Sequence, residues 1–229
     1  IFMSPDLSPG GLPEDTSTET TWTPVWTVSD YEADPITAAV YGVGALKSFD
    51  GYLFWGTMHV PGLSTAAHQG ACETVGTDCT DNSDPAELLI LSERAISLFR
   101  GRDFDASGEA IDLLYGYPAM PVFDASNGAW TTQPNKMTQV PLFGLAGFNN
   151  PLNNYTWTMD VFDDRLWVGT MDLSGLIAFG NGADPEGTQI LGVGADLWFF
   201  IDADQAAQPE SLSGVGNMAN YGIRTMLTS

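Results

Sequence analysis

The chain has 229 residues, of which 44% are hydrophobic and 11% aromatic, and 29 acidic against 7 basic side chains give a formal net charge of −22 at pH 7. This apolar content excludes a wholly disordered protein, and the length can bury the core of one large all-β domain or two smaller ones. The charge argues against nucleic acid and against an anionic membrane surface as partners, because both need basic side chains. It fits cations, neutral polar ligands or simple solubility.

No apolar run approaches the roughly 18 residues of a membrane span, so we expect no integral membrane segment. Ile1 is not an initiator methionine followed by a basic region, which indicates a processed or internal start. Cys72 and Cys79 are the two cysteines, and they lie in a segment rich in Asp, Thr and Asn. Their even number favours a local disulfide, with two free thiols in a cytosolic protein as the alternative. The disulfide predicts an extracellular or periplasmic location.

The first 60 residues lead from loop into a hairpin. Residues 1–20 are rich in turn signals and predict a loop, whereas residues 21–28 alternate around a proline and favour an edge strand at best. Residues 36–47 then lead into a hairpin with Asp50-Gly51 at its tip, a strong turn dipeptide. Residues 60–86 form a long irregular insertion in this interpretation, and its length favours a functional or disulfide-tied segment.

Further strands are predicted after this insertion. Residues 86–92 and 95–100 indicate a strand pair, and a helix across 85–100 is the alternative, because its leucines also suit one helical face. We prefer strands, since the corresponding residues 195–201 are aromatic, β-branched and too few for a helix. Residues 110–115 predict another strand. Helix start and stop signals are rare throughout the chain.

A second hairpin repeats the first. Residues 116–154 are mostly loop in this interpretation, and Tyr155–Asp172 predicts two strands joined by a turn at Asp163-Asp164. Residues 47–59 align with residues 160–172 without a gap. The identical pairs in this alignment are Phe49/Phe162, Asp50/Asp163, Leu53/Leu166, Gly56/Gly169, Thr57/Thr170 and Met58/Met171.

A third copy begins near the end of the chain. Gly147–Met159 resembles Gly214–Met226 when one residue of slack is allowed, and the sequence then stops at Ser229. Either the chain is a piece of a longer repeat protein, or the missing strand comes from elsewhere. We predict a single all-β repeat domain over residues 1–229, part of a larger propeller, with a loop-rich entry at 1–40, a first repeat at 41–153 with its insertion at 60–86, a second repeat at 154–219 and a truncated third repeat at 220–229.

Repeats of four short strands with glycine-rich corners favour radial or stacked β architectures over a sandwich. The two hairpins resemble the blades of bacterial exported β-propellers, and the residues that carry this resemblance are Phe49-Asp50-Gly51, Leu53, Gly56-Thr57, Phe162-Asp163-Asp164 and Leu166-Trp167-Val168-Gly169-Thr170. The resemblance implies β-propeller-like repeats of four-stranded antiparallel sheets, about three blades plus a truncated one, and therefore an incomplete propeller. The aromatic residues expected to pack between blades are Phe49, Phe54, Trp55, Trp157, Phe162, Trp167 and Trp198.

Two pairs of residues at matching strand ends are candidates for facing a ligand. His59 and Asp172 each follow directly after Gly-Thr-Met, so we expect Met58, His59, Met171 and Asp172 to converge on one face or channel. A loop histidine bonded to backbone is the alternative for His59. His59, His68 and Met58 also form a soft ligand set that would suit copper.

Acidic residues predict calcium at two places. Asp78, Asp81 and Asp84 are spaced to wrap Ca²⁺, which prefers several oxygen ligands on a flexible loop. The glycine and the closing glutamate of an EF-hand are absent, and a solvated acidic loop is the alternative. Asp202 and Asp204 form a weaker second candidate for calcium.

The sequence contains no nucleophile elbow, zinc-protease helix or phosphate-binding glycine loop. We therefore expect an exported acidic β-propeller binding or assembly module that is non-catalytic and calcium-stabilised. Its partner would be another protein or further copies of the same repeat. A first alternative is a propeller hydrolase that acts on carbohydrate through Asp and Glu residues as acid and base. A second alternative is a copper-binding surface protein.

Overall fold

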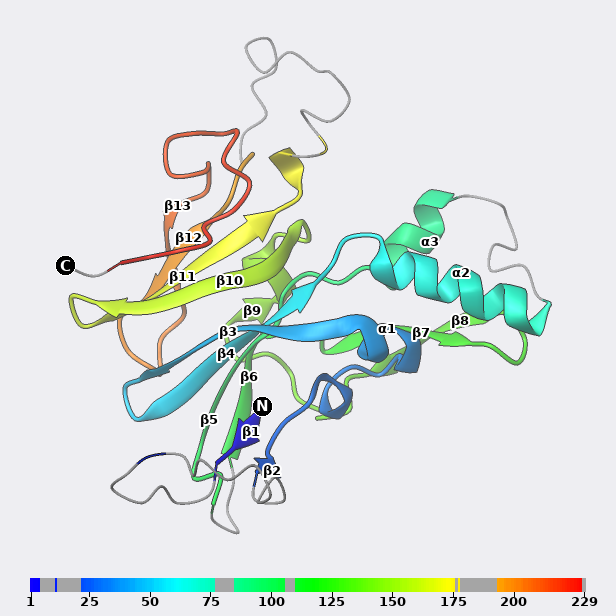
Figure 1. Cartoon of the computed structure of the whole chain (residues 1–229), viewed down its shortest axis with the longest axis horizontal. Coiled ribbons are helices and arrows are strands. Elements are labelled where there is room, and N and C mark those ends of the chain that lie inside the picture. The colour runs from blue at the N-terminus through cyan, green and yellow to red at the C-terminus, as the bar shows by residue number, and fades with distance from the viewer. Residues whose placement is uncertain are drawn as a thin grey trace.

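A computed structural model describes residues 1–4, 11, 22–76, 85–105, 110–175, 177 and 193–227 of the chain. These residues form a mostly β protein with few helices, built around one curled nine-stranded sheet (Figure 1). Two small two-stranded sheets accompany it.

Of the three α-helices, the first precedes the strands of the large sheet and the other two lie between its second and third strands in chain order. In chain order they are β1 (Phe2–Met3), β2 (Thr23–Pro24), the 3-10 helix η2 (Val28–Asp30), α1 (Pro35–Val40), β3 (Tyr41–Phe49), β4 (Tyr52–His59), α2 (Leu63–Val75), α3 (Pro85–Ser92), β5 (Leu98–Arg102), β6 (Ala110–Gly116), β7 (Ala119–Asp124), β8 (Ala129–Pro134), β9 (Gly144–Leu145), the 3-10 helix η3 (Ala146–Asn149), β10 (Asn153–Phe162), β11 (Arg165–Asp172), β12 (Leu197–Phe200) and β13 (Gln208–Ser211).

The large sheet is built from two antiparallel meanders and the short strand β9, which pairs with β6 in parallel. Strands β3, β4, β5 and β6 pair consecutively and form the first unit, and strands β10, β11, β12 and β13 do the same and form the second unit. The units are joined by one pairing between Met58 on β4 and Tyr155 on β10. Figure 1 shows the second unit, yellow-green to orange, lying against the first unit, blue to green.

Each unit begins with one of the predicted hairpins, and both hairpins are confirmed. Asp50 and Gly51 have φ of 49° and 78°, and Asp163 and Asp164 have φ of 52° and 54°. Two central residues with positive φ define the type I′ turn, whose twist matches that of the flanking strands. Strand β3 pairs with β4 as far as Tyr41 and His59, so the hairpin register follows the turn.

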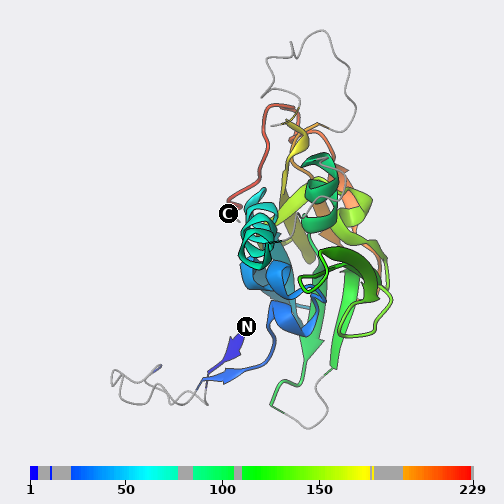
Figure 2. The same ribbon diagram turned by 90° about the vertical axis from the view of Figure 1, so that its right-hand side faces the viewer.

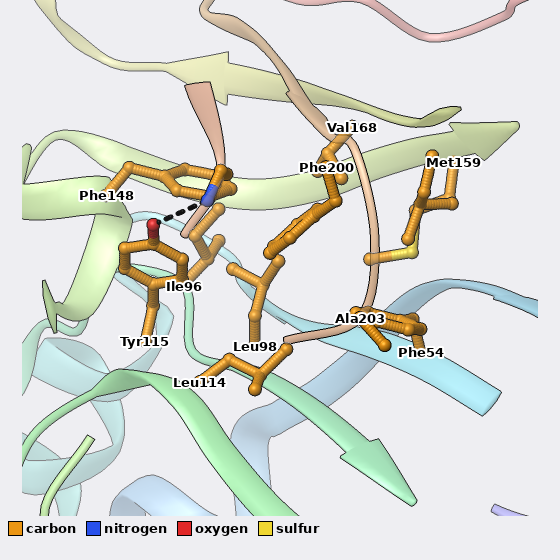
Figure 3. Close-up of a cluster of buried hydrophobic side chains, with 12 residues drawn as sticks. Phe54, Ile96, Leu98, Leu114, Tyr115, Phe148, Met159, Val168, Phe200 and Ala203 are labelled. Atoms are coloured by element: carbon orange, nitrogen blue, oxygen red, sulfur yellow. Dashed lines mark hydrogen bonds between the residues drawn. The ribbon is translucent and has the colours of Figure 1, made fainter. Parts of the chain in front are cut away.

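The main core lies between the two units. Phe54 and Leu98 of the first unit pack in one cluster with Leu166, Val168 and Phe200 of the second unit. All five side chains have 0% exposure. The cluster also contains Ile96, Leu114, Tyr115, Phe148, Met159, Ala203 and Ala207, and Figure 3 shows its members converging, with the backbone N–H of Ala207 donating to the Tyr115 hydroxyl over 3.0 Å.

A second core covers the opposite face of the first unit. Trp55 and Phe99 stack there with ring centroids 5.6 Å apart, and Trp26 from the N-terminal segment contacts both rings. Tyr31 packs edge-on against Phe99. Because neighbouring residues on a strand point to opposite faces, Phe54 and Trp55 serve different cores. The first unit is thus covered on both faces.

The prediction of a strand over residues 86–92 is wrong, because this segment is the helix α3. Pro85 stands at its start, where the fixed φ of proline suits a helix and its missing N–H costs nothing. Leu88 is buried while the next two residues, Leu89 and Ile90, are 47% and 74% exposed. Burial on one side of a helix, not alternation, is therefore the pattern of this segment. The strand predicted over 95–100 begins later, at Leu98.

The prediction that residues 60–86 are irregular is wrong over Leu63–Val75, because these residues form the helix α2. Figure 2 shows this helix almost along its axis. The helix ends at Val75, and Gly76 after it has a φ of 70°, which is usual for a residue that terminates a helix. Its most buried residues are Ser64, His68 and Cys72, spaced four apart. Since these residues are small or polar, the buried stripe gives no hydrophobic periodicity in the sequence.

Two further elements were not predicted. Asp34 caps α1 by accepting a hydrogen bond from the Thr37 backbone N–H over 2.7 Å, and Pro35 occupies the first turn. Residues 116–154, expected to be mostly loop, contain the β7–β8 hairpin. The prolines Pro121 and Pro134 within these strands masked the hairpin, because proline usually argues against a strand.

The two units approach most closely where β10 crosses β3 and β4. A Cβ on Gly56 would lie 2.1 Å from Thr156 Oγ1, and a Cβ on Gly44 would lie 2.3 Å from the Thr156 carbonyl oxygen. Thr156 is buried and β-branched, so it has little freedom to move away. Glycine is therefore required at both positions by the close approach of the strands.

Gly56→Ala should lower the free energy of unfolding by about 1–3 kcal/mol, because the added methyl group overpacks the crossing. Gly70→Ala on α2 is the control, since nothing lies within 4 Å of the added atom. It should be neutral or stabilising by up to about 1 kcal/mol, as alanine suits a helix better than glycine. Urea unfolding measures both variants. Equal stabilities would show that the crossing does not need glycine.

Candidate functional site

Each unit contains the same hydrogen-bonded joint, in which a threonine near the end of the second strand bonds to the residue just before the third strand. The Thr57 backbone N–H donates to the Ser97 carbonyl over 3.0 Å, and the Ser97 N–H donates to Thr57 Oγ1 over 2.8 Å. In the second unit the Thr170 N–H donates to the Asp196 carbonyl over 3.0 Å, and the Asp196 N–H donates to Thr170 Oγ1 over 2.9 Å. The two joints therefore have the same geometry.

A corner loop closes each joint. The Gly147 N–H donates to the Ile96 carbonyl over 2.7 Å, and the Gly214 N–H donates to the Ala195 carbonyl over 2.9 Å. Gly147 and Gly214 have φ of 69° and 65°. The residues that follow them, Phe148 and Val215, also have positive φ, a conformation that is uncommon outside glycine.

The strand after each corner loop lies against the preceding unit in the same way. Tyr155 pairs with Met58 of the first unit, and Gly222 pairs with Met171 of the second unit, which is the residue aligned with Met58. Ile223 fills the space beside Gly169, where a Cβ would lie 2.8 Å from it, much as Thr156 fills the space beside Gly56. Residues 214–223 thus repeat the backbone pattern of residues 147–156.

The four predicted ligand-facing residues divide between two faces. Met58, Tyr155 and Met171 are cross-strand neighbours in one row. His59 and Asp172 are the next residues along their strands and therefore point to the opposite face. His59 is 1% exposed and Asp172 is 0% exposed, so neither side chain reaches a free surface.

His59 is held by Glu93 at the end of α3. Its Nε2 lies 3.0 Å from Glu93 Oε2, while the Gly62 N–H at the start of α2 donates to Glu93 Oε1 over 2.9 Å. The edge of the His59 ring meets Tyr41 with centroids 5.0 Å apart. Both His59 ring nitrogens and Glu93 Oε2 are buried without a well-aligned hydrogen bond within the described part of the chain, so the contact between Nε2 and Oε2 is close but not aligned. Glu93 therefore accepts a hydrogen bond from the start of α2 and lies in close contact with His59 on β4.

The equivalent place in the second unit holds two buried carboxylates. The Asn150 amide donates to Asp172 Oδ2 over 2.6 Å, and the Asn153 amide donates to Asp196 Oδ2 over 2.7 Å. Burial raises the pKa of Asp196, the two asparagine amides oppose this effect, and the nearby charge of Asp172 adds to it. Both carboxylates are less than 3% exposed and are occupied by amides of the corner loop, so the pair serves as structure at this joint.

Ser64, His68 and Asp34 form an arrangement that sequence reasoning missed. Ser64 Oγ lies 3.4 Å from His68 Nδ1, and His68 Nε2 lies 3.2 Å from Asp34 Oδ1. His68 Nδ1 is closer to another acceptor, the Ser64 carbonyl oxygen, at 2.7 Å. Ser64 Oγ also lies 3.1 Å from Thr37 Oγ1, so its hydroxyl is shared within this buried group and is not directed at the histidine alone. All three side chains are 0% exposed, and this arrangement is structural.

Asp34 ties three elements together at this place. One oxygen accepts from the Thr37 N–H and the other accepts from the Phe123 N–H, both over 2.7 Å. Burial works against ionisation here, but the His68 hydrogen bond and these two backbone N–H groups outweigh it and lower the pKa of Asp34 to about 2. The carboxylate therefore joins α1 to α2 and to β7.

A second buried ion pair stands next to it. Arg94 Nε donates to Glu32 Oε2 over 3.0 Å, and Arg94 Nη2 donates to Glu32 Oε1 over 3.2 Å. Arg94 also donates to the carbonyls of Leu91 and Pro121 over 2.8 Å each. A bidentate guanidinium with its remaining N–H groups on carbonyls is well satisfied, and it fixes the N-terminal segment to α3 and β7.

The predicted metal ligands do not gather within the described residues. His59 and His68 each have a different carboxylate partner, Glu93 and Asp34 respectively. In the part of the chain that the structure describes, no group of three or more His, Cys, Asp or Glu side chains is placed to hold a metal ion. Asp78, Asp81 and Asp84 lie outside the described residues, so the calcium prediction there stays a prediction.

The second calcium candidate is part of the contact between the units. Asp202 accepts hydrogen bonds from the Asp204 N–H over 2.9 Å and from Gln205. Asp204 Oδ1 accepts from Arg100 Nη1 over 2.8 Å. Asp202 also borders an open cleft of about 400 Å³ between the two hairpin tips, together with Asp50, Asp164, Ser48, Phe49, Val161 and Ile201.

Only one of the two cysteines of the predicted disulfide, Cys72, is among the described residues. Cys72 is 3% exposed on α2 and has no free thiol. Cys79 lies outside the described residues, so the pairing of the two stays a prediction. Where the structure describes the chain, none of the helices combines the length and apolar character needed to cross a membrane.

Comparison with models of protein families, with curated proteins and with solved structures gave no match to this chain.

Asp34→Asn should lower the free energy of unfolding by about 2–3 kcal/mol at pH 7, because it removes a buried carboxylate that His68 and two backbone N–H groups contact. Since the pKa of Asp34 falls from 3.8 to about 2 on folding, its stabilising effect is present above pH 4 and is lost as the pH falls towards 2. The difference between wild type and variant in urea unfolding should therefore shrink over this range. Asp105→Asn, at an exposed position, is the control. A difference that does not change with pH would contradict the assignment.

Proposed function

We propose that this chain is a binding or assembly module of an exported, acidic, β-propeller-type repeat protein, and that its partners are other protein units stacked on its sheets. The observation that carries this proposal is the repetition of the joint. Residues 147–156 form a corner loop at Gly147 and then cross the first unit beside Gly56. Residues 214–223 do the same in the second unit, with the corner at Gly214 and the crossing beside Gly169. In a chain built this way, residues 214–223 lie where the first strand of a further stacked unit would begin.

The stacking of the units supports the blade interpretation. Each unit is a four-stranded antiparallel meander, and the two bury aromatic and aliphatic side chains between their faces. Neither unit has enough surface to bury both of its faces alone, which is the physical reason for repeats of this kind to stack. The first strands of the two units also meet through an ion pair, with Lys47 Nζ 2.6 Å from Asp160 Oδ1.

Two features support binding over catalysis and an exported location. The Ser64–His68–Asp34 arrangement and the Asp172–Asp196 pair are buried and fully engaged in joining elements. The net charge of −22 and the absence of a free thiol at Cys72 fit an extracellular or periplasmic protein. No particular observation favours the carbohydrate hydrolase or the copper-binding protein as a second candidate.

The proposal predicts that a chain lengthened by one of its own units will stack it. Because Met159 and Met226 are aligned, residues 1–226 can be followed directly by a second copy of residues 160–227, here called the added unit. We expect this extended chain to unfold in one transition, at a higher temperature and with a larger denaturant slope, because more surface is buried on folding. Calorimetry and urea unfolding measure this.

The matched control carries Leu166→Asp and Val168→Asp in the added unit alone, where these residues would face the original second unit. This variant should behave like the unextended chain with a disordered tail. If the unmodified added unit also unfolds separately, or exchanges its amide hydrogens without protection, the assembly function is rejected.

A further inference from the structure

The contact between the two units has a specific polar part at the edge of its apolar core. Arg100 lies over the ring of Tyr52 with a distance of 4.7 Å to the centroid. Its Nη1 donates to the Ala203 carbonyl and to Asp204 Oδ1, and the Ala203 N–H donates to Asp50 Oδ2 over 2.9 Å. A loop of the second unit, Asp202–Asp204, is thus clamped between an arginine and the hairpin tip of the first unit.

At the aligned positions on the outer side of the second unit, an arginine again lies over an aromatic ring, but the two residue types have changed places. Arg165 aligns with Tyr52, since each follows its hairpin turn and pairs across it with a phenylalanine. Phe199 occupies the position of Arg100, opposite the tryptophan that aligns with Phe54. The Arg165 guanidinium lies 4.9 Å from the centroid of the Phe199 ring, so arginine and ring have exchanged places and kept their contact.

This arginine has no acidic partner among the residues that the structure describes. Arg94, Arg100, Arg102 and Lys47 each lie within ion-pair distance of a carboxylate. Arg165 does not, and neither do Lys136 and Arg224, although the chain carries 29 acidic residues. An arginine over an aromatic ring keeps most of its N–H donors available for carbonyl and carboxylate oxygens.

The surroundings of Arg165 are apolar and continue the internal contact. The outer face of the second unit consists of the residues that align with the covered face of the first unit: Phe162, Arg165, Trp167, Leu197 and Phe199. Phe54, which is 0% exposed beneath the second unit, corresponds to the half-buried Trp167. Phe49, which packs against the core, corresponds to Phe162, which is 54% exposed.

From this correspondence we infer that the outer face docks a further four-stranded β unit whose loop presents a carboxylate and a backbone carbonyl to Arg165, as Asp202–Asp204 presents them to Arg100. Asp163, which aligns with Asp50, accepts a backbone N–H of that loop. The occupant is therefore a β-sheet protein unit with an acidic loop of the Asp-x-Asp kind. This inference rests on the proposed function and adds the chemistry by which the partner is recognised.

The test is a double-mutant cycle in the extended chain, which supplies such a loop in its added unit. Arg165→Ala in the original second unit and Asp204→Ala in the added unit are made singly and together. Hydrogen exchange of β11 in the original unit reports closure of the new contact. Each single variant should raise the opening equilibrium on the order of tenfold, and the double variant should raise it little further, because both remove one shared interaction.

Two comparisons keep the result specific. Arg165→Ala in the 229-residue chain should leave the unfolding midpoint nearly unchanged, since its carboxylate partner is then missing. Arg100→Ala and Asp204→Ala in that chain give the coupling of the internal contact for reference. If the added unit stacks but the two substitutions have additive or no effects, the acidic-loop recognition is wrong while the assembly function survives. An added unit that does not stack overturns both.

Discussion

The backbone at Gly44 and Gly56 lies so close to Thr156 that no side chain fits between them, and this contact sets the distance at which the two units stack. At that distance the faces of two four-stranded meanders interdigitate, and Phe54, Leu98 and Phe200 lose all contact with solvent. Packing at the density of a protein interior leaves no room for adjustment. The crossing and the core therefore depend on each other, since either one alone would leave the two units free to shift against each other.

The polar groups buried near the crossing explain how one orientation of the units is selected. Backbone groups that leave a sheet must find partners, and the side chains of Asn150, Asn153 and the two joint threonines supply them. Such bonds add little net stability but are costly to break, so a misplaced unit would bury unpaired groups. The carboxylates of Asp34 and Glu93 act likewise at the helices, where they fix α2 against the sheet.

The distribution of charge follows the same logic. A chain with net charge −22 has few cations, and the two arginines nearest the inter-unit faces lie over aromatic rings. At the internal face the Arg100 guanidinium donates a hydrogen bond to Asp204 in the acidic loop of the neighbouring unit. The exchange of arginine and ring between Tyr52–Arg100 and Arg165–Phe199 keeps an arginine over a ring at matching positions of two successive faces. A charge that is largely desolvated in this way favours a partner with the matching carboxylate.

The sequence by itself determined the hairpins and their repetition. Turn residues that accept positive φ and strands with alternating aromatic residues act over a few neighbouring positions, so both can be seen without the fold. Tertiary structure decided α2 and α3, because the buried side of α2 is Ser64, His68 and Cys72, a set that becomes a stripe only when its polar partners Asp34 and Thr37 are in place. It also decided that His59 meets Glu93 and that Arg94 pairs with Glu32, since burial and ion pairing join residues distant in the chain. The backbone preference of a segment depends on a few neighbouring residues, whereas the environment of a side chain depends on which segments the fold brings next to it.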